Sequence, residues 1–271
     1  FSESYAFNDV AVDSNGYVYA ARESGPNGQG KGGTVYKIDP SGNEVWSWET
    51  SEEDSFDYLV SLLSVEVDSG GNVYVGAMGG SLTKLDSTGT EQWSTVLNSQ
   101  YSDKQAIVVG EDGDVYVGIN NGSVWKIDPA DGSRIDQSTW SNLGFGDVRD
   151  LAFGDGHLLV GDDEYENQKI SKVTPQASVV WQNDNHTDYV AGVAVDADGY
   201  SYTSGQDDTF REFDSTGTQQ WSISGGAGRG VAVKPAPSNA APTADFTYTK
   251  SSLSVDFTDQ STDDGTIVAR D

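Results

Sequence analysis

One pattern is repeated five times along most of the chain. Each copy ends in a run that contains a tryptophan, and these tryptophans recur every 40 to 47 residues, at Trp46, Trp93, Trp140, Trp181 and Trp221. Each copy holds four short runs in which apolar and polar residues alternate, separated by turns rich in Gly, Asp, Asn and Ser. Alternation with a period of two is typical of β-strands, and such turns connect antiparallel neighbours. The repeat therefore predicts a series of four-stranded antiparallel sheets.

The second copy shows the pattern most clearly. Residues 63–67 alternate, 69–72 form a turn, 73–76 return, and two further short runs follow at 82–85 and around Trp93. Four-stranded units that recur about every 40 residues are typical of blades around a central axis. We therefore expect an all-β fold, a β-propeller with five recognisable blades over residues 1–234. Residues 230–234 look like the first strand of another blade, so we expect a parent ring of six or seven blades.

Two kinds of known repeat resemble these segments. VYVGAMGGSLTKLDSTGTEQW and VYVGINNGSVWKIDPADG resemble quinoprotein-type propeller repeats. The fifth copy is similar to a degenerate WD-repeat, with Asn185-His186 at the Gly-His position and Phe213-Asp214 at the Trp-Asp position. The WD resemblance implies a structural hydrogen-bond network through His186 and Asp207. We expect structural roles for these two residues and for the recurring residues Asp214, Trp46, Trp93, Trp181 and Trp221.

The C-terminal part has a different composition. Residues 235–242 (PAPSNAAP) form a Pro-rich linker of small residues. Residues 243–271 resemble the first half of a PKD-type Ig-like domain and predict a partial β-sandwich. PKD modules are extracellular spacers, so the resemblance implies an exported, multidomain parent protein of which this chain is a piece.

Acidic residues dominate the charge. The chain has 43 Asp and Glu against 15 Lys and Arg, a net charge of −28. Self-repulsion on this scale destabilises a compact chain in dilute salt, but above about 1 M salt the Debye length falls to about 3 Å. The composition resembles that of haloarchaeal and haloarchaeal-virus proteins and predicts a high-salt, extracellular location. It argues against nucleic acid as a partner, because phosphate binding needs a basic surface.

Cysteine is absent, which excludes disulfides, Cys-ligated metals and thiol nucleophiles. Two sequons, at Asn121 and Asn185, are candidate glycosylation sites of an exported protein. No run of residues is long and apolar enough for a membrane helix, so we expect no membrane insertion by this segment.

Acidic loops are the candidate metal sites. The first choice is the loop with Asp162, Asp163, Glu164 and Glu166, whose hard oxygens suit calcium. Similar clusters lie at 52–57 and 111–114, and none has EF-hand spacing. Residues 25–31 match most of a phosphate-binding loop, but Gly32 stands where Ser or Thr is needed and a strand follows instead of a helix. Apart from calcium, we expect no cofactor.

The sequence offers little for catalysis. His157 and His186 are its two histidines, and neither lies in a nucleophile or metal motif. We expect a non-enzymatic recognition, adhesion or scaffold module, either on a cell surface or in a virion tail fibre, spike or turret. Its partners would be a surface protein or glycan of a host or neighbouring cell, or other subunits of the same surface or virion. The alternative is a secreted quinoprotein-like or carbohydrate-active enzyme.

Overall fold

The computed structural model describes residues 6–24, 32–51, 60–97, 105–119, 122–135, 143–163, 168–225 and 230–233, and the backbone of 246–251 and 254–259. Five four-stranded antiparallel sheets account for the first 20 strands, and a two-stranded sheet follows. The predicted all-β fold with five four-stranded blades is confirmed. No helix in the described part of the chain is long and apolar enough to cross a membrane.

We number the five sheets as blades in chain order, from the first to the fifth. The first comprises β1 (Phe7–Val12), β2 (Val18–Arg22), β3 (Thr34–Ile38) and β4 (Glu44–Glu49). The second comprises β5 (Leu62–Val67), β6 (Val73–Ala77), β7 (Ser81–Leu85) and β8 (Glu91–Val96). The third comprises β9 (Gln105–Val109), β10 (Val115–Ile119), β11 (Ser123–Ile127) and β12 (Arg134–Ile135). The fourth comprises β13 (Asp147–Gly154), β14 (His157–Asp163), β15 (Ile170–Val173) and β16 (Val179–Asn183). The fifth comprises β17 (Val190–Val195), β18 (Ser201–Gly205), β19 (Thr209–Phe213) and β20 (Gln219–Ser224).

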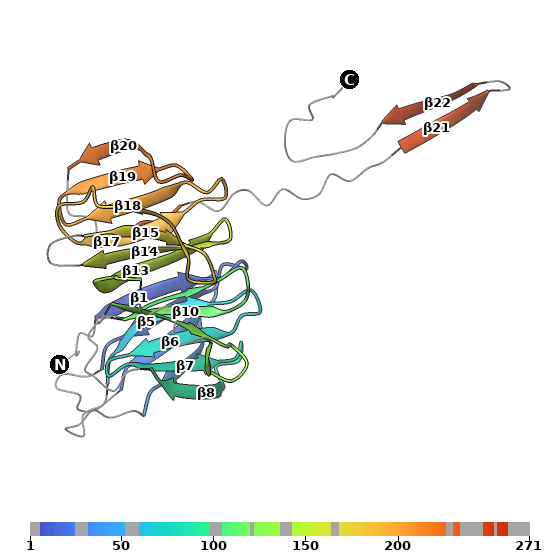
Figure 1. Ribbon diagram of the computed structural model, residues 1–271. Coiled ribbons are helices and arrows are strands. Elements are labelled where there is room, and N and C mark those ends of the chain that lie inside the picture. Colours follow the sequence, from blue (N-terminus) through green and yellow to red (C-terminus); the bar gives the residue numbers. More distant parts are fainter. Residues whose placement is uncertain are drawn as a thin grey trace. The chain divides into compact units, whose positions relative to one another are not determined.

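Consecutive blades pack face to face, with their first strands in contact in chain order. Figure 1 shows this stacking for the fourth and fifth blades, coloured olive to orange. Four hydrophobic clusters fill the four junctions between consecutive blades. At the first junction, Tyr19 and Val35 of the first blade pack with Leu62 and Val73 of the second, and all four are at most 1% exposed. The core is therefore divided among the junctions.

Aspartates organise the turns between strands. In the first blade, Asp13 accepts hydrogen bonds from the backbone amides of Asn15 and Tyr17 and from the Tyr19 hydroxyl. Asp68 repeats the bond to a tyrosine in the second blade, at Tyr74. A side chain that binds nearby amides favours a turn over a continued strand. The short Asp-containing turns therefore set the hairpin spacing of each blade.

A tryptophan–glycine contact joins the outer parts of neighbouring blades. The glycines Gly89, Gly132 and Gly217 each lie against the indole of the preceding blade, on Trp46, Trp93 and Trp181 respectively. At Gly89, φ is +83° and an added Cβ would lie 2.8 Å from the Trp46 ring. The position therefore requires glycine twice, for its left-handed backbone and for the close approach of the ring.

A row of lysines runs along the third strands, and three of its four members reach a carbonyl oxygen of the next blade. Lys37, Lys84, Lys126 and Lys172 occupy equivalent places in the third strand of the first four blades, and the fifth blade has Glu212 there. Lys37 donates to the carbonyl of Ser87 at 3.3 Å and Lys84 to that of Pro129 at 2.8 Å, both in the next blade. Four of the nine lysines thus lie along the blades rather than in the solvent-facing turns.

The chain divides into two compact units, Phe1–Val233 and Lys234–Asp271. In the second unit, β21 (Phe246–Ser251) and β22 (Ser254–Asp259) form an antiparallel pair. Two paired strands are compatible with many all-β folds, so the PKD-type fold of residues 243–271 stays a prediction.

Candidate functional site

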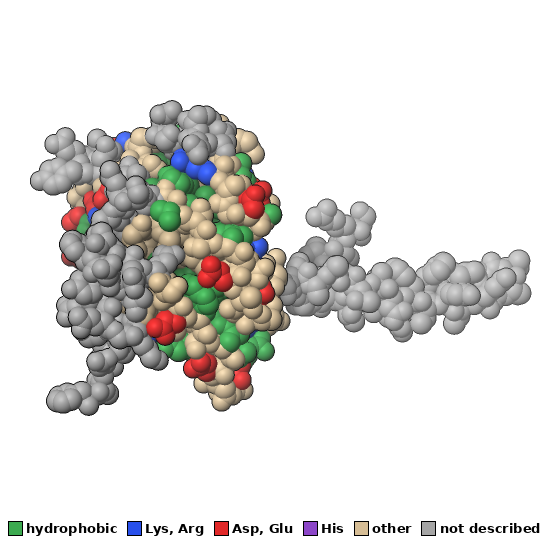
Figure 2. All heavy atoms as spheres, turned by 90° about the horizontal axis from the view of Figure 1, so that it is seen from below, with side chains coloured by type: hydrophobic (Ala, Val, Ile, Leu, Met, Phe, Trp, Pro, Cys, Tyr) green, Lys and Arg blue, Asp and Glu red, His purple; other side chains and the backbone are tan. Residues whose placement is uncertain are grey.

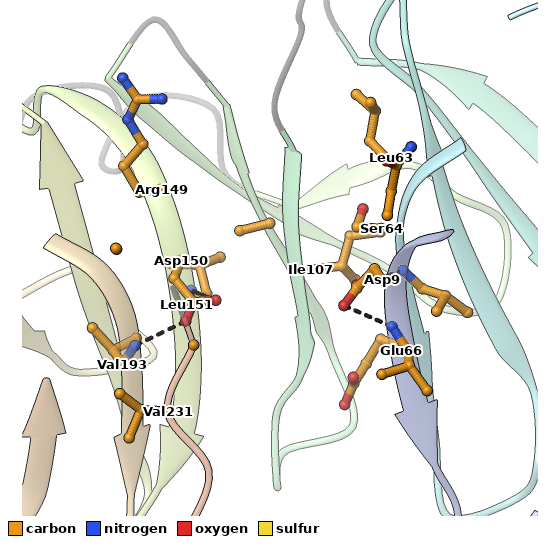
Figure 3. A pocket seen from close by; sticks show the side chains of 16 residues that line it. Asp9, Leu63, Ser64, Glu66, Ile107, Arg149, Asp150, Leu151, Val193 and Val231 are labelled. Atoms are coloured by element: carbon orange, nitrogen blue, oxygen red, sulfur yellow. Dashed lines mark hydrogen bonds between the residues drawn. The ribbon is translucent and has the colours of Figure 1, made fainter. Parts of the chain in front are cut away.

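The first strands of all five blades line one cavity of about 440 Å³ in the middle of the first unit. Asp9 comes from β1, Glu66 from β5, Ile107 from β9 and Asp150 from β13, while β17 contributes Ala191 and Val193. Residues 230 and 231 line it as well. Figure 3 shows the three carboxyl groups gathered around this space, which we call the axial cavity.

Two of these carboxylates bridge neighbouring blades. Asp9 Oδ2 accepts a hydrogen bond from the Val65 amide of the second blade at 2.9 Å. Asp150 Oδ2 accepts one from the Val193 amide of the fifth blade at 2.8 Å (Figure 3). Both aspartates follow an irregularity in strand pairing, between Phe7 and Asp9 and between Val148 and Asp150. Such a bulge re-aims a side chain, and here it directs the carboxylate toward the next blade.

The third carboxyl group, Glu66, is half-buried beside the axial cavity. Burial, together with the negative charges of Asp9 and Asp150, raises the pKa of Glu66 to about 8. Burial also raises the pKa of Asp150 to about 7, although hydrogen bonds from Val193 and Leu151 oppose this rise. Burial raises the pKa of Asp9 as well, so all three carboxyl groups of the axial cavity hold a proton more readily than an exposed carboxyl group does. Such a cluster can donate and accept protons or bind a cationic group.

The nearest cation does not neutralise these acids. Arg149 also lines the cavity, but its guanidinium forms an ion pair with Asp163 and lies 5.1 Å from the centre of the Tyr189 ring. Figure 3 shows the Arg149 side chain directed away from Asp150. The electrostatic character of the axial cavity is therefore acidic.

A second polar cluster lies in the fifth blade, around the fully buried His186. Its Nδ1 is 3.0 Å from Asp207 Oδ1 and its Nε2 is 2.8 Å from Thr203 Oγ1. Asp207 also accepts hydrogen bonds from the Thr187 amide and from Arg211. Burial lowers the pKa of His186. The structure thus brings together the histidine and aspartate for which the WD resemblance implied a network, and the histidine is neutral.

Burial alone would raise the pKa of Asp207, but hydrogen bonds from Thr209, His186, Thr187 and Arg211 hold it well below its usual range. The ionised Asp207 therefore orders the turn between β18 and β19. Asp214, the other structural aspartate from the sequence, accepts the amides of Thr216 and Thr218 in the turn between β19 and β20. Asp207 and Asp214 therefore each stabilise a turn of the fifth blade through hydrogen bonds.

The acidic loop chosen for calcium is only partly described. Asp162 is fully buried and accepts hydrogen bonds from the amides of Lys169 and Gly146, while Asp163 pairs with Arg149. Glu164 and Glu166 lie outside the described residues. Within the described ranges, no three His, Asp or Glu side chains form a group that could hold a metal ion. The calcium site in this loop stays a prediction.

The structure shows the contacts of three other residues that were singled out from the sequence. Asp112 and Asp114 form ion pairs with Lys126 at 2.9 and 2.8 Å. Asn185 is exposed, and its Nδ2 donates to Gln219 Oε1 at 2.9 Å. The remaining candidates, Asn121, Trp140 and the segments 25–31 and 52–57, lie outside the described residues.

Sequence analysis missed the axial carboxylates and the lysine row. With 43 acids in the chain, no single Asp or Glu stood out. The available signal was position: Glu66 is the one charged residue of its first strand, and Asp9 and Asp150 occupy the same place in their blades. The lysines could have been found in the same way, since each is the last residue but one of the third strand in the first four repeats.

Comparisons with known proteins agree with this architecture. Residues 31–162 match the family described as outer membrane protein assembly factor BamB. Comparison with curated proteins finds no significant match. A protein of unknown function from Bacteroides caccae is similar in structure, with 15% identity, a TM-score of 0.57, and coverage of 82% of this chain and 83% of that one.

Two further solved structures are similar. The WD40 β-propeller domain of Doa1 has 15% identity and a TM-score of 0.62, with coverage of 80% of this chain and 68% of that one. The computationally designed protein Ika8 has 16% identity and a TM-score of 0.61, with coverage of 84% of this chain and 65% of that one. At these identities the likeness shows the propeller fold alone. The resemblance to quinoprotein-type and WD-type repeats is confirmed at that level.

Proposed function

We propose that the first unit is a non-enzymatic, extracellular recognition or scaffold module of a halophilic cell surface or virion. The observation that carries the proposal is the distribution of the positively and negatively charged side chains over the fold. The lysine row and Arg149 contact other parts of the propeller. Several of the few positively charged side chains therefore form contacts within the fold. Many of the acids that outnumber the cations lie in the turns between strands. A propeller with acidic turns is suited to presenting loops in brine.

The surface supports a high-salt setting. Figure 2 shows Asp and Glu side chains spread over the described part of one face, with few Lys or Arg among them. At about 0.15 M salt the Debye length is about 8 Å, so such neighbours repel each other, whereas molar salt screens them. The description of the matched family names an assembly factor. This supports a scaffold role over a catalytic one.

The axial cavity favours a second candidate, a secreted carbohydrate-active or quinoprotein-like enzyme. Glu66, whose pKa is raised to about 8, lies beside two further carboxyl groups, and such an arrangement can supply a general acid and a base or stabilising anion. Bound quinone would be visible in the absorbance spectrum of protein purified from its natural source. Glycosidase activity that disappears in Glu66→Gln would favour this candidate over the scaffold.

Binding to a halophilic cell surface tests the proposal directly. The fluorescently labelled chain would be titrated onto haloarchaeal cells and their isolated surface glycoproteins in 3 M KCl. We expect saturable binding that unlabelled chain displaces and that an unrelated protein of equal net charge does not show. Binding that is absent from all such surfaces, together with turnover of a sugar or alcohol substrate, would reject the recognition role.

A further inference from the structure

Two polar groups on the wall of the axial cavity have no partner within the described fold. Ser64 is 4% exposed, and its hydroxyl has no hydrogen-bond partner among the described residues. The half-buried carboxyl group of Glu66, two residues along the same strand, likewise accepts no hydrogen bond from the described part of the chain. A buried polar group without a hydrogen bond is costly. Both groups line the cavity, so a ligand bound there would supply their partners.

The place of Ser64 in its blade explains why its hydroxyl faces the cavity. Ser64 follows the same irregularity in strand pairing as Asp9 and Asp150 do in their blades. At this place the two aspartates reach across to a backbone amide of the next blade. The shorter serine side chain binds no described amide, so its hydroxyl stays on the wall of the axial cavity.

The aspartates of the cavity can accept further hydrogen bonds. Asp9 and Asp150 each accept two backbone amides. An ionised carboxylate has about four acceptor sites, so each aspartate keeps about two for a ligand. Among the described residues of the lining, Arg149 carries the only positive charge, and it pairs with Asp163 instead. A cationic ligand that donates hydrogen bonds therefore complements this wall.

The acidic groups lie on two sides of the cavity. Figure 3 shows Asp150 on one side and Asp9 and Glu66 on the other, with Ser64 on the side of Asp9. Within the described ranges, these carboxyl groups form no set that could hold a single metal ion. Much of the remaining wall is apolar, and the volume of about 440 Å³ is that of a small-molecule site. Two separated acidic sides with an apolar wall suit two cationic groups joined by an alkyl chain.

We propose that the axial cavity binds an aliphatic diamine, with one ammonium group beside Asp150 and the other beside Asp9 and Glu66. The second ammonium group also donates to the Ser64 hydroxyl oxygen, and the methylene groups pack on the apolar wall. Buried ion pairs are screened by salt much less than exposed ones, so binding persists in brine. The site does not depend on which surface the module recognises, so failure of either function leaves the other standing.

Diamine binding should release protons. Burial raises the pKa of Asp9, Glu66 and Asp150 in the empty cavity, and an ammonium group beside them would lower it again. Affinity should therefore rise from pH 6 to pH 8.5, where aliphatic amines, with a pKa of about 10, stay protonated. The other charged groups that face this cluster are Arg149 and, through an adjoining cavity of about 350 Å³ that Glu66 also lines, Asp68 and Glu111.

Calorimetric titration of the full chain in 3 M KCl at pH 8.5 tests the proposal. The probes are linear diamines of three to six carbons with an amino group at each end, and the controls are the monoamine and the diol of the same chain length. We expect one saturable site for at least one diamine, with an affinity at least about tenfold above that of the monoamine, and no binding of the diol. No saturable binding of any diamine, or equal affinity for the monoamine, would overturn the proposal.

Three variants locate the site. Glu66→Gln and Asp150→Asn keep the side-chain shape, remove one charge from each side, and should each weaken diamine binding about tenfold. Ser64→Ala should weaken it about fivefold without lowering the melting temperature of the ligand-free chain, because the hydroxyl it removes has no described partner. Glu91→Gln, at an exposed residue, is the matched control and should bind as the unaltered chain does. Affinities in all three variants equal to that of the control would overturn the proposal.

Two further measurements separate a diamine from other occupants. Affinity for the best diamine would be compared at pH 6 and pH 8.5 in the unaltered chain and in Glu66→Gln, where we expect a smaller rise with pH. Equal affinity at both values in the unaltered chain would overturn the proposed contacts. A rise in melting temperature with millimolar calcium or magnesium, lost in Glu66→Gln and matched by no diamine, would identify a metal site and would also overturn the proposal.

Discussion

Trp46 donates its indole Nε1–H to the carbonyl oxygen of Ser87 across 3.1 Å, and so ties the fourth strand of the first blade to a turn of the second. Trp93 donates in the same way to the carbonyl of Pro129 in the third blade, also at 3.1 Å. Each indole is in addition covered by the glycine that ends the same turn. In each of the first two blades, one tryptophan thus combines a directional bond with apolar contact at the periphery, where the central core does not reach.

Substitution of Gly89 tests this contact, because Gly42 provides an internal control. Gly89→Ala should lower the free energy of unfolding by about 3 kcal/mol, from a left-handed alanine plus overpacking against Trp46. Gly42→Ala has nearly the same φ but open space around the added Cβ, so it should cost only about 1 kcal/mol. Chemical unfolding of both variants in 3 M KCl measures the difference. Equal losses would show that the ring contact contributes nothing.

The His186 network should be a major stabiliser of the fifth blade. His186→Ala removes the partner of Thr203 and one partner of Asp207, and we expect a loss of about 2–4 kcal/mol in the free energy of unfolding. Asn185→Ala, at the exposed neighbouring residue, should change it by less than about 0.5 kcal/mol. A His186→Ala loss as small as the control's would mean that the network is not coupled to folding.

The lowered pKa of His186 also predicts a direction of pH dependence. The unfolded chain binds a proton at this histidine below about pH 6.5, whereas the folded chain resists protonation there. This residue therefore makes the protein less stable as pH falls through about 6.5. The difference in stability between the unaltered chain and His186→Gln should shrink between pH 7.5 and pH 5. A constant difference would argue against a buried neutral imidazole.

Glu66 should give the opposite dependence of stability on pH. Its pKa rises from an ordinary value of 4.5 to about 8 in the folded state, so between these values the folded chain binds more protons than the unfolded chain. Its contribution to stability is thus present at low pH and is lost as pH rises through this window. Glu66→Gln should flatten that part of the stability profile and stabilise the protein at pH 9 by about 2 kcal/mol. Glu91→Gln, in an exposed strand, should leave the profile unchanged.

Salt should stabilise the whole fold. Between 0.1 and 3 M KCl the Debye length falls from about 10 Å to below 3 Å, and repulsion among the surface acids is screened. We expect the melting temperature to rise steadily over this range. A melting temperature that stays level from 0.1 to 3 M would count against salt adaptation.

The blades could be predicted from the sequence because the patterns that indicate their strands and turns are local. Alternation and turn residues lie within about ten positions of each other, so β5 to β8 could be placed from the second repeat alone. The pairing of His186 with Asp207 followed from a resemblance. The axial cavity could not be predicted, because Asp9, Glu66 and Asp150 approach one another only after the blades close around the axis. The Trp46–Gly89 contact likewise depends on how neighbouring blades are offset.

A crystal structure of the 271-residue chain in molar KCl would test the central claim most directly. The claim is that a tryptophan of one blade and a turn glycine of the next join the first blade to the second, the second to the third and the fourth to the fifth. We predict Gly89, Gly132 and Gly217 against the indoles of Trp46, Trp93 and Trp181. Two sheets packed as a sandwich, or indoles directed into solvent away from these glycines, would contradict it.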